Sequence, residues 1–385
     1  MKRRGFLKGA GVVTVLVMGG LVWRSSSQGV FSTGKGPAYE PWKNWREDES
    51  EGALGLVRAA ILAASPHNTQ PWLFRLTENS IDMFADTNRN IGAIDPYLRE
   101  MYIGMGCALE NLLLAANARG YSYQLKIMPN ATDASHVAEI KLTSSSVLRS
   151  KLYDAIPNRH TNRGPHDMQY KISQDTLNTL ASISSDIPEV TVLWLTTEAE
   201  RRKFSDLNAD ATAALIADEE QSKASYSWGR MKWDEVQHYR DGVTIDSFPI
   251  SPAFRAVTKI LPTLSRETAD KYFLDAMKGL YDTTDTFGVI VVRNNRDNAQ
   301  RVLGGRVWQK MHLLGTTLGL AMAPVNQIPE RIDREDSIGS KPYFGQKLQE
   351  LIAFNGGQAL MPFRVGHPTI DALTSPRRSA MDVLI

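Results

Sequence analysis

Three short segments carry polar residues where the backbone must turn, and each could take part in binding. The first is AASPHNTQPW, residues 63–72, in which two prolines fix the backbone around Ser65, His67 and Asn68. Rigid loops with amide side chains and free backbone amides suit recognition of a flat heterocycle with carbonyl and imide edges. Read alone, the segment also fits a plain helix end followed by a turn.

The second segment is NRHTNRGPH, residues 158–166, where Arg159 and Arg163 stand on either side of Thr161. Two guanidiniums near a hydroxyl and free backbone amides can hold a phosphate through bidentate, charge-assisted hydrogen bonds. A solvated basic face is the alternative interpretation.

The third segment is the C-terminus, FRVGHPTIDALTSPRRSAMDVL, residues 363–384. Its turn at Ser375-Pro376 is followed by Arg377 and Arg378, which add two more guanidiniums. On its own this stretch could be a surface tail.

Other catalytic and nucleotide-binding patterns are missing from the sequence. It has no glycine-rich phosphate loop and no serine nucleophile elbow. His160 and His166 are six residues apart, a spacing that does not place both on one helix face for a metal. We therefore expect no metal site and assign no catalytic acid or base; for His67 and His367 we expect structural roles.

The elements that would position these segments fall into two halves, with the second beginning near residue 151. Apolar periodicity and turn residues predict both helices and strands. The expected helices cover 51–64, 99–118, 173–183, 198–224, 297–321 and 346–354, and the expected strands cover 72–76, 81–85, 121–128, 136–143, 191–197, 287–292 and 360–366.

One helix from each half shows a similar glycine pattern. GCALENLLLAANARGY runs from Gly106 to Gly120 and GRVWQKMHLLGTTLGL from Gly305 to Gly319, so the spacing is 14 in both (120 − 106 and 319 − 305). Amphipathic helices often look alike, so chance similarity is one explanation. The other is an internal repeat, in which two related α+β units are fused.

Taken together, the three segments resemble the nitroreductase fold, whose members bind FMN at the interface of a dimer. SPHNTQPW is similar to a loop that covers the flavin from one subunit, while RHTNR and SPRR are similar to basic segments that the other subunit supplies. The run ADTNRNIGAIDPYLREMYIGMGCAL and the RVGHPT ending resemble the two-domain Acg-type branch. The resemblance implies an α+β fold built as an internal pseudo-dimer, each half a mixed, mainly antiparallel sheet packed with helices.

The resemblance also implies a division of the cofactor site between the halves. The phosphate of FMN would be held by Arg159, Thr161, Arg163 and one of Arg377 or Arg378. The ribityl chain or ring would be lined by Ser65, His67 and Asn68, and the isoalloxazine would face Ala323, Pro324 and Val325.

The function that this implies is FMN-dependent reduction of electron-poor substrates, such as nitro-aromatics and quinones, by flavin hydride transfer. A second hypothesis is a flavin-binding or flavin-sequestering protein with little turnover. It is motivated by residues 226–251, in which Trp228, Trp233, Tyr239 and Phe248 stand among charges. This segment could form a lid over the site, or an ordinary loop pinned by its aromatics.

Composition and the N-terminus bear on partners and compartment. The 385 residues include 44 Lys and Arg against 42 Asp and Glu, so the net charge of +2 gives no bulk reason to bind nucleic acid. Arg-Arg-x-Phe-Leu-Lys at residues 3–8 resembles a twin-arginine export motif, so 1–30 is expected to be a signal or membrane anchor and 31–50 a linker. We expect a monomer that is periplasmic or otherwise exported by the twin-arginine machinery, with domains at 51–150 and 151–385.

Overall fold

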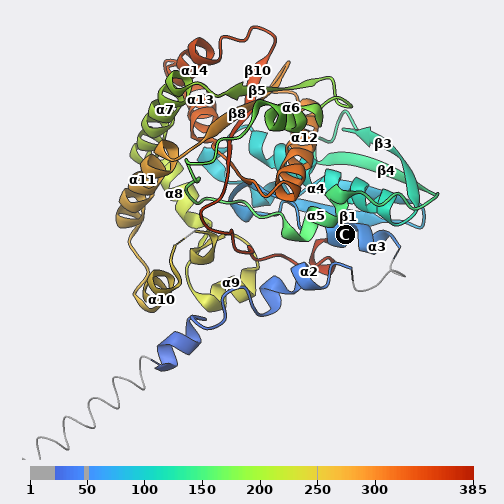
Figure 1. The fold of residues 1–385 in the computed structure, drawn as a ribbon. Helices are drawn as coiled ribbons and strands as arrows, with labels where there is room; N and C mark the ends of the chain where they lie inside the picture. The colour runs from blue at the N-terminus through green and yellow to red at the C-terminus, as the bar shows by residue number, and fades with distance from the viewer. Residues whose placement is uncertain (1–21, 47–51, 249) are drawn as a thin grey trace, which may run out of the picture.

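The computed structural model describes residues 22–46, 52–248 and 250–385; the export motif therefore lies outside the described residues. The chain folds into two four-stranded antiparallel sheets flanked by helices (Figure 1). The first sheet consists of β1 (Trp72–Leu76), β2 (Ser80–Ala85), β3 (Tyr121–Ile127) and β4 (His136–Ser144), and the second of β5 (Val190–Leu195), β8 (Thr286–Val292), β9 (Ala321–Pro324) and β10 (Gln358–Gly366). This confirms the expected α+β class.

Both sheets have the same topology. Their strand orders are β1-β2-β4-β3 and β5-β8-β10-β9, so in each half the first, second, fourth and third strands lie side by side in that order. A 20-residue helix follows the second strand of each sheet: α4 (Arg99–Ala118) in the first half and α12 (Asn298–Thr317) in the second. The shared order and the equivalent helices show two related units.

These two helices pack directly against each other through the paired glycines. A Cβ on Gly106 would lie 2.1 Å from the carbonyl oxygen of Val302, and a Cβ on Gly305 would lie 2.0 Å from that of Ile103. Only glycine permits so close an approach of the two backbones. The first hydrophobic core is continuous across this contact and includes residues of both sheets.

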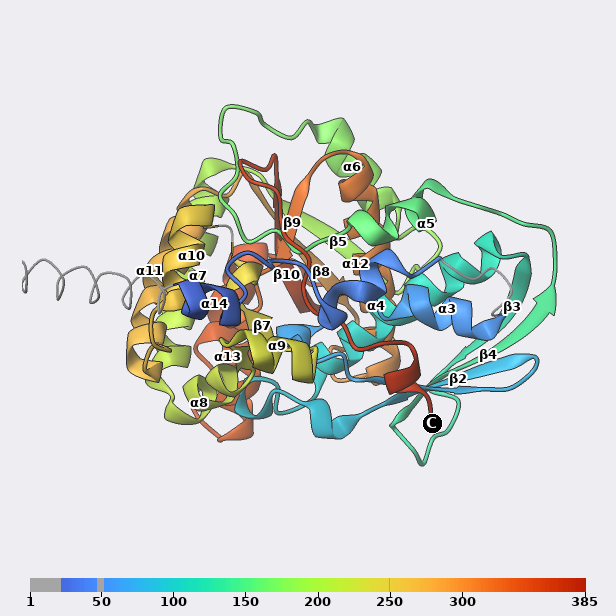
Figure 2. The ribbon, with the colours of Figure 1, turned by 90° about the horizontal axis from the view of Figure 1, so that it is seen from below.

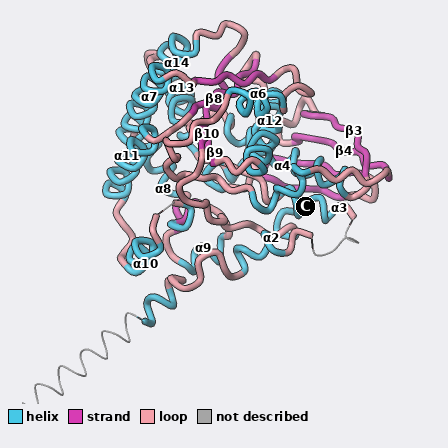
Figure 3. The backbone as a smooth tube through the Cα atoms, viewed as in Figure 1, coloured by secondary structure: helices cyan, strands magenta, loops and turns pink. Residues whose placement is uncertain are grey.

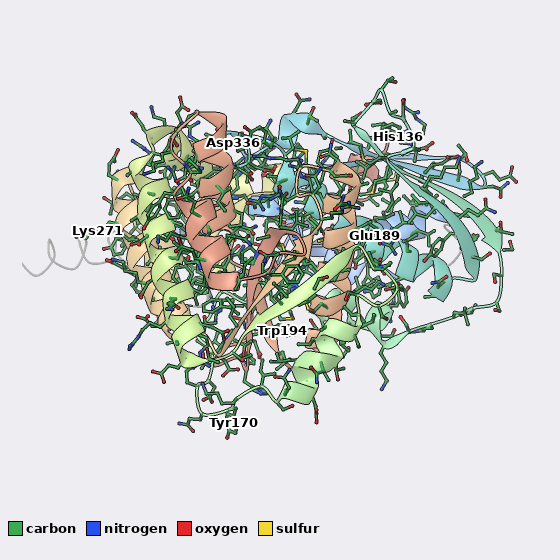
Figure 4. All side chains as sticks on the ribbon, turned by 90° about the horizontal axis from the view of Figure 1, so that it is seen from above. His136, Tyr170, Glu189, Trp194, Lys271 and Asp336 are labelled. Atoms are coloured by element: carbon green, nitrogen blue, oxygen red, sulfur yellow. The ribbon has the colours of Figure 1, made fainter. Side chains whose placement is uncertain are left out.

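The halves differ in the connection between their first two strands. In the first half it is the three-residue turn 77–79, whereas in the second it spans residues 196–285. This long connection and the β9–β10 connection form a helical layer on one side of the molecule, opposite the first sheet; Figure 4 labels Lys271 in the layer and His136 at the first sheet (Figures 2 and 4). The helices of these two connections are α7 (Glu198–Ala217), α8 (Glu219–Ser227), α9 (Trp233–Tyr239), α10 (Pro252–Ile260), α11 (Arg266–Asp282), α13 (Gln327–Ser337) and α14 (Phe344–Ile352); α9 lies apart from the layer, beside the N-terminal segment.

The single helix expected over 198–224 is wrong, because the chain breaks at Asp218. Asp218 is extended (φ −81°, ψ 105°), and its side chain accepts a hydrogen bond from the backbone N–H of Gln221, which caps α8. Arg334 of α13 donates to the same carboxylate at 2.8 Å. The tertiary ion pair and the cap together favour two helices over one.

Of the residues 31–50 that were expected to form a linker, the structure describes 31–46, and these are packed against the rest of the protein. Residues 22–46, here called the N-terminal strap, run along the body as short helices and loops, including α2 (Glu40–Lys43) (Figure 3). Tyr39, Trp42 and Trp45 are 1%, 7% and 5% exposed. Burial of three aromatic side chains outweighs the local preference of this Gly- and Pro-containing stretch for an open chain.

Candidate functional site

The loop between α3 (Ala53–Ala60) and β1 has a strained backbone. His67, Asn68 and Gln70 have φ angles of 45°, 56° and 52°, in the left-handed region that non-glycine residues rarely adopt. The hydroxyl of Ser65 accepts the backbone N–H of Gln70 at 3.1 Å, so this serine holds the turn closed. Strain of this kind is maintained by surrounding contacts and is common at ligand sites.

Arg377, from the C-terminal segment, lies directly against this loop. Its guanidinium donates to Asn68 Oδ1 at 2.6 Å and to the carbonyl oxygens of Pro376 at 2.8 Å and Ala63 at 3.0 Å. The side chain is 3% exposed, and its Nε has no hydrogen-bond partner. A residue of the second half is thereby fixed onto the loop of the first.

Arg159 reaches the end of the same first-half segment. It is 1% exposed and donates one hydrogen bond, to the carbonyl oxygen of Leu62 at 2.9 Å. Its Nε and its other terminal nitrogen are buried without a partner. Arg159 and Arg377 are close enough for the charge on Arg159 to lower the pKa of Arg377, in addition to the larger effect of burial.

Arg163 lies near the same loop, close enough to His67 for the two to interact electrostatically; it is half-buried and has no hydrogen-bond partner among the described residues. Its charge contributes, after burial, to lowering the pKa of His67 to about 4. Arg163 and Thr161 line a cavity of about 10 Å³ that is closed by residues 246–248 and 371–373. We call Arg159, Arg163 and Arg377 the arginine cluster.

The arginine cluster carries positive charge that no described carboxylate pairs with, and it shares this property with the buried Arg364, whose one hydrogen bond goes to the carbonyl oxygen of Gly164. In the described part of the chain none of the cluster's three members forms an ion pair with a carboxylate, and burial lowers the pKa of each guanidinium, that of Arg159 to about 10. Arg99, by contrast, is equally buried but bonds to Asp333 at 2.7 Å and pairs with Glu100. A buried cation without a counter-ion is costly, so the free N–H groups of these guanidiniums could accept an anion.

Residues of the expected lid cover this loop. Gln70 donates to the carbonyl oxygen of Arg240 at 2.8 Å, and Asn68 and Gly242 are joined by two hydrogen bonds of 3.2 Å. Asp241 pairs with Arg89 of the first half. The segment 226–251, which contains α9, is therefore fastened to the binding loop.

Trp42 of the N-terminal strap is a site residue that sequence reasoning missed. Its ring centroid lies 4.7 Å from the guanidinium carbon of Arg377 and 4.7 Å from the His160 ring, and its indole N–H donates to the carbonyl oxygen of Ser375 at 2.7 Å. Burial and the two neighbouring arginines lower the pKa of His160 to about 3, so this ring is neutral. Three aromatic residues within 39–45 were the available signal.

The remaining residues expected at the site are Arg378 and those expected to face the flavin ring, and they contact the arginine cluster less closely. Arg378 donates to the carbonyl oxygens of Gln70 and Asp382, so Arg377, and not Arg378, belongs to the arginine cluster. The loop of Arg163 borders β9 through a hydrogen bond from Asn162 N to Met322 O at 3.1 Å. Of the expected ring-facing residues, two are buried and one is half-buried: Ala323 and Val325 are 3% and 1% exposed, and Pro324 retains more surface.

Comparison with known proteins finds partial matches to nitroreductases. No family model matches the chain. Two proteins of Mycobacterium tuberculosis, both named as candidate NAD(P)H nitroreductases, match part of it. One is 30% identical over 132 residues, which cover 34% of this chain and 38% of the relative. The other, acg, is 33% identical over 115 residues, which cover 28% of this chain and 34% of the relative. The matched region thus spans little more than a third of the curated relatives.

Solved nitroreductases are among the structural neighbours. NfnB of Mycobacterium smegmatis, in complex with NADPH, covers 60% of this chain and 96% of its own at 14% identity with a TM-score of 0.37. A nitroreductase of Desulfitobacterium hafniense with bound FMN covers 60% and 94% at 13% identity with a TM-score of 0.35. Because these TM-scores lie below 0.5, function is argued from the site itself.

Proposed function

We propose that the arginine cluster binds the phosphate of FMN and that the protein is a nitroreductase-like oxidoreductase. The observation that carries the proposal is the group of three arginines with no carboxylate partner, held against the strained loop at Ser65–Gln70. Guanidiniums with free N–H groups match the charge and geometry of a phosphate. The relatives named as NAD(P)H nitroreductases support a reductase.

The donor set fits FMN, but the cavity at Arg163 is far too small for it at about 10 Å³. Binding therefore requires that residues 246–248, residues 371–373 or the N-terminal strap move aside. When bound, the flavin would supply hydride transfer. Asn68, held by Arg377, would orient the cofactor, and Trp42 with the lid would exclude water.

We further propose nitro-aromatics, quinones or similar electron-poor compounds as substrates and a nicotinamide as one candidate electron donor. Export by the twin-arginine route is part of the same proposal. It would fit a protein that takes up its cofactor before leaving the cytoplasm, and the single cysteine, Cys107, excludes an intrachain disulfide.

A flavin-holding protein with little turnover is the second candidate. It is favoured by the tight closure of the site, where the lid, the C-terminal segment and the N-terminal strap meet over the arginine cluster. Anaerobic mixing of the flavin-loaded protein with NADH or NADPH separates the two: rapid bleaching of the flavin would exclude the second candidate, whereas no bleaching would leave another donor or no catalysis.

The phosphate assignment is tested by replacing one guanidinium at a time. We expect Arg163→Gln to lose most of its FMN on purification or dialysis, because it removes a charge that has no protein partner. Arg378→Gln is the matched control, since that side chain binds backbone carbonyls outside the arginine cluster. Equal flavin content in the two variants would contradict the assignment.

A further inference from the structure

Helix α10 exposes its apolar side to solvent and turns its cationic side toward the protein. Phe254 and Val257, three residues apart on the helix, are 60% and 52% exposed, and Leu261 and Leu264, just beyond its end, are 55% and 41% exposed. A surface helix of a globular protein normally turns such residues toward the core. Contiguous exposed apolar residues of this kind indicate a contact surface.

The cationic residues of α10 face the protein instead. Lys259 is 8% exposed and donates to Asp246 Oδ2 at 2.9 Å, and Arg255 lies 3.4 Å from the other carboxylate oxygen of Asp246. Arg255 also donates to the carbonyl oxygens of Phe248 and Ile250. These bonds fix the rotation of the helix, so its apolar face points outward.

The start of the described chain lies beside this helix. Residues 22–27 are helical, and Arg24 donates to the carbonyl oxygen of Ile260 at the end of α10 (Figures 1 and 2). Lys259 donates in addition to the carbonyl oxygen of Gly29. Val22 and Trp23 are 65% and 71% exposed, so the apolar surface of the strap continues that of α10.

The sequence before Arg24 indicates which partner covers the exposed surface of α10. The fifteen residues 9–23 contain no charged side chain and end at Trp23-Arg24, a pair typical of a membrane–water interface. In the described part of the chain, no helix is long and apolar enough to cross a bilayer. Because Arg24 contacts the end of α10, an apolar segment that enters lipid just before it would bring the exposed residues of α10 to the same surface.

We propose that Phe254, Val257, Leu261 and Leu264 form an interfacial surface that inserts into the headgroup region of a lipid bilayer beside the N-terminal segment. An interfacial helix buries its apolar side at this depth while its polar side remains outside the hydrocarbon. In this protein the polar side is neutralised by Asp246. Asp246 holds the cationic side of α10 and also lines the cavity at Arg163. The proposed membrane surface and the cavity are thus connected through this one residue.

The test uses the full chain with a polarity-sensitive fluorophore on a single introduced cysteine. Native Cys107 is 1% exposed, and burial raises the pKa of its thiol to about 12, so it does not compete for the label. Val257→Cys places the probe on α10. Val147→Cys is the matched control: Val147 is 65% exposed and follows β4, at the opposite end of the molecule from α10 (Figures 1 and 2).

With vesicles of phosphatidylethanolamine and phosphatidylglycerol, we expect the probe at 257 to shift to the blue and to be quenched by spin-labelled lipid, and the probe at 147 to do neither. Phe254→Ser combined with Val257→Ser should weaken vesicle partitioning about tenfold, and Val147→Ser should leave it unchanged. The proposal is overturned if the chain does not bind vesicles, or binds them with the 257 probe still in water. It is equally overturned if the 257 signal changes with protein concentration alone, since a second copy would then cover α10.

Discussion

Replacing Trp42 by alanine is expected to destabilise the fold and to open the arginine cluster. The side chain is 7% exposed and packs between His160 and Arg377. Removal of a buried tryptophan costs about 3–5 kcal/mol where the cavity persists, and loss of its contact with Arg377 adds about 0.5–1 kcal/mol. Because the N-terminal strap can partly collapse into the space, we expect a loss of about 3 kcal/mol in the free energy of unfolding.

Two measurements check this result. Urea unfolding at neutral pH gives the stability change. Trp42→Phe is the intermediate variant, since it keeps a ring over Arg377 but loses part of the buried ring and the 2.7 Å hydrogen bond to Ser375, worth about 1 kcal/mol. The rate of FMN release should rise in Trp42→Ala because water gains access to Arg377 and His160. A stability within about 0.5 kcal/mol of the original, the level of an ordinary surface substitution, together with an unchanged release rate, would refute the role assigned to the strap.

Three other perturbations test separate parts of the structure. Gly305→Ala should lower the free energy of unfolding by about 1–3 kcal/mol, because its Cβ would lie 2.0 Å from a backbone oxygen of α4. Gly279→Ala is the control and should be neutral or stabilising, since a Cβ there would have no atom within 4 Å. Similar values for both variants in denaturant unfolding would contradict the close helix contact. Asp218→Ala should cost about 1–3 kcal/mol by removing a helix cap and ion pairs with α13, and unchanged stability would show that another feature breaks the helix. The pKa of His67 falls from 6.5 to about 4 on folding, so the unfolded chain takes up the proton first and stability is lost as the pH falls from 6.5 to 4. Since His67 is only half-buried, His67→Gln should reduce that loss by about 1–3 kcal/mol, and identical pH profiles would contradict a neutral, folded-state His67.

Much of the fold could be predicted because local periodicity and tertiary packing agree. The helix expected over 99–118 is α4, Arg99–Ala118, since its apolar residues recur at helical spacing and Gly120 follows its end. The shared glycine spacing of 14 suggested that the two helices are equivalent parts of a repeat, and only the structure shows that Gly106 and Gly305 meet. Strand order, by contrast, depends on contacts between distant residues that no local pattern encodes.

The sequence singled out the segments of the candidate site and the lid at 226–251, but not the part that the N-terminal strap plays. The segments containing Asn68, Arg159 and Arg377 stand out in sequence by their prolines and paired arginines. The N-terminal strap was misread because Gly and Pro in 31–50 suggest a linker, whereas Trp42 finds its partners more than a hundred residues away. The break at Asp218 was missed for the same reason, because Arg334 stabilises it from a different element.

The measurement that tests the central claim most directly is a comparison of FMN and riboflavin binding to the flavin-free protein. The two ligands share the ring and ribityl chain and differ only in the phosphate that the arginine cluster is proposed to hold. We expect FMN to bind at least about a hundredfold more tightly, a difference of about 2.7 kcal/mol, and to give visible flavin absorption that denaturation releases. Equal affinity for the two, or a colourless protein that takes up neither, would contradict the assignment of the arginine cluster as a flavin phosphate site.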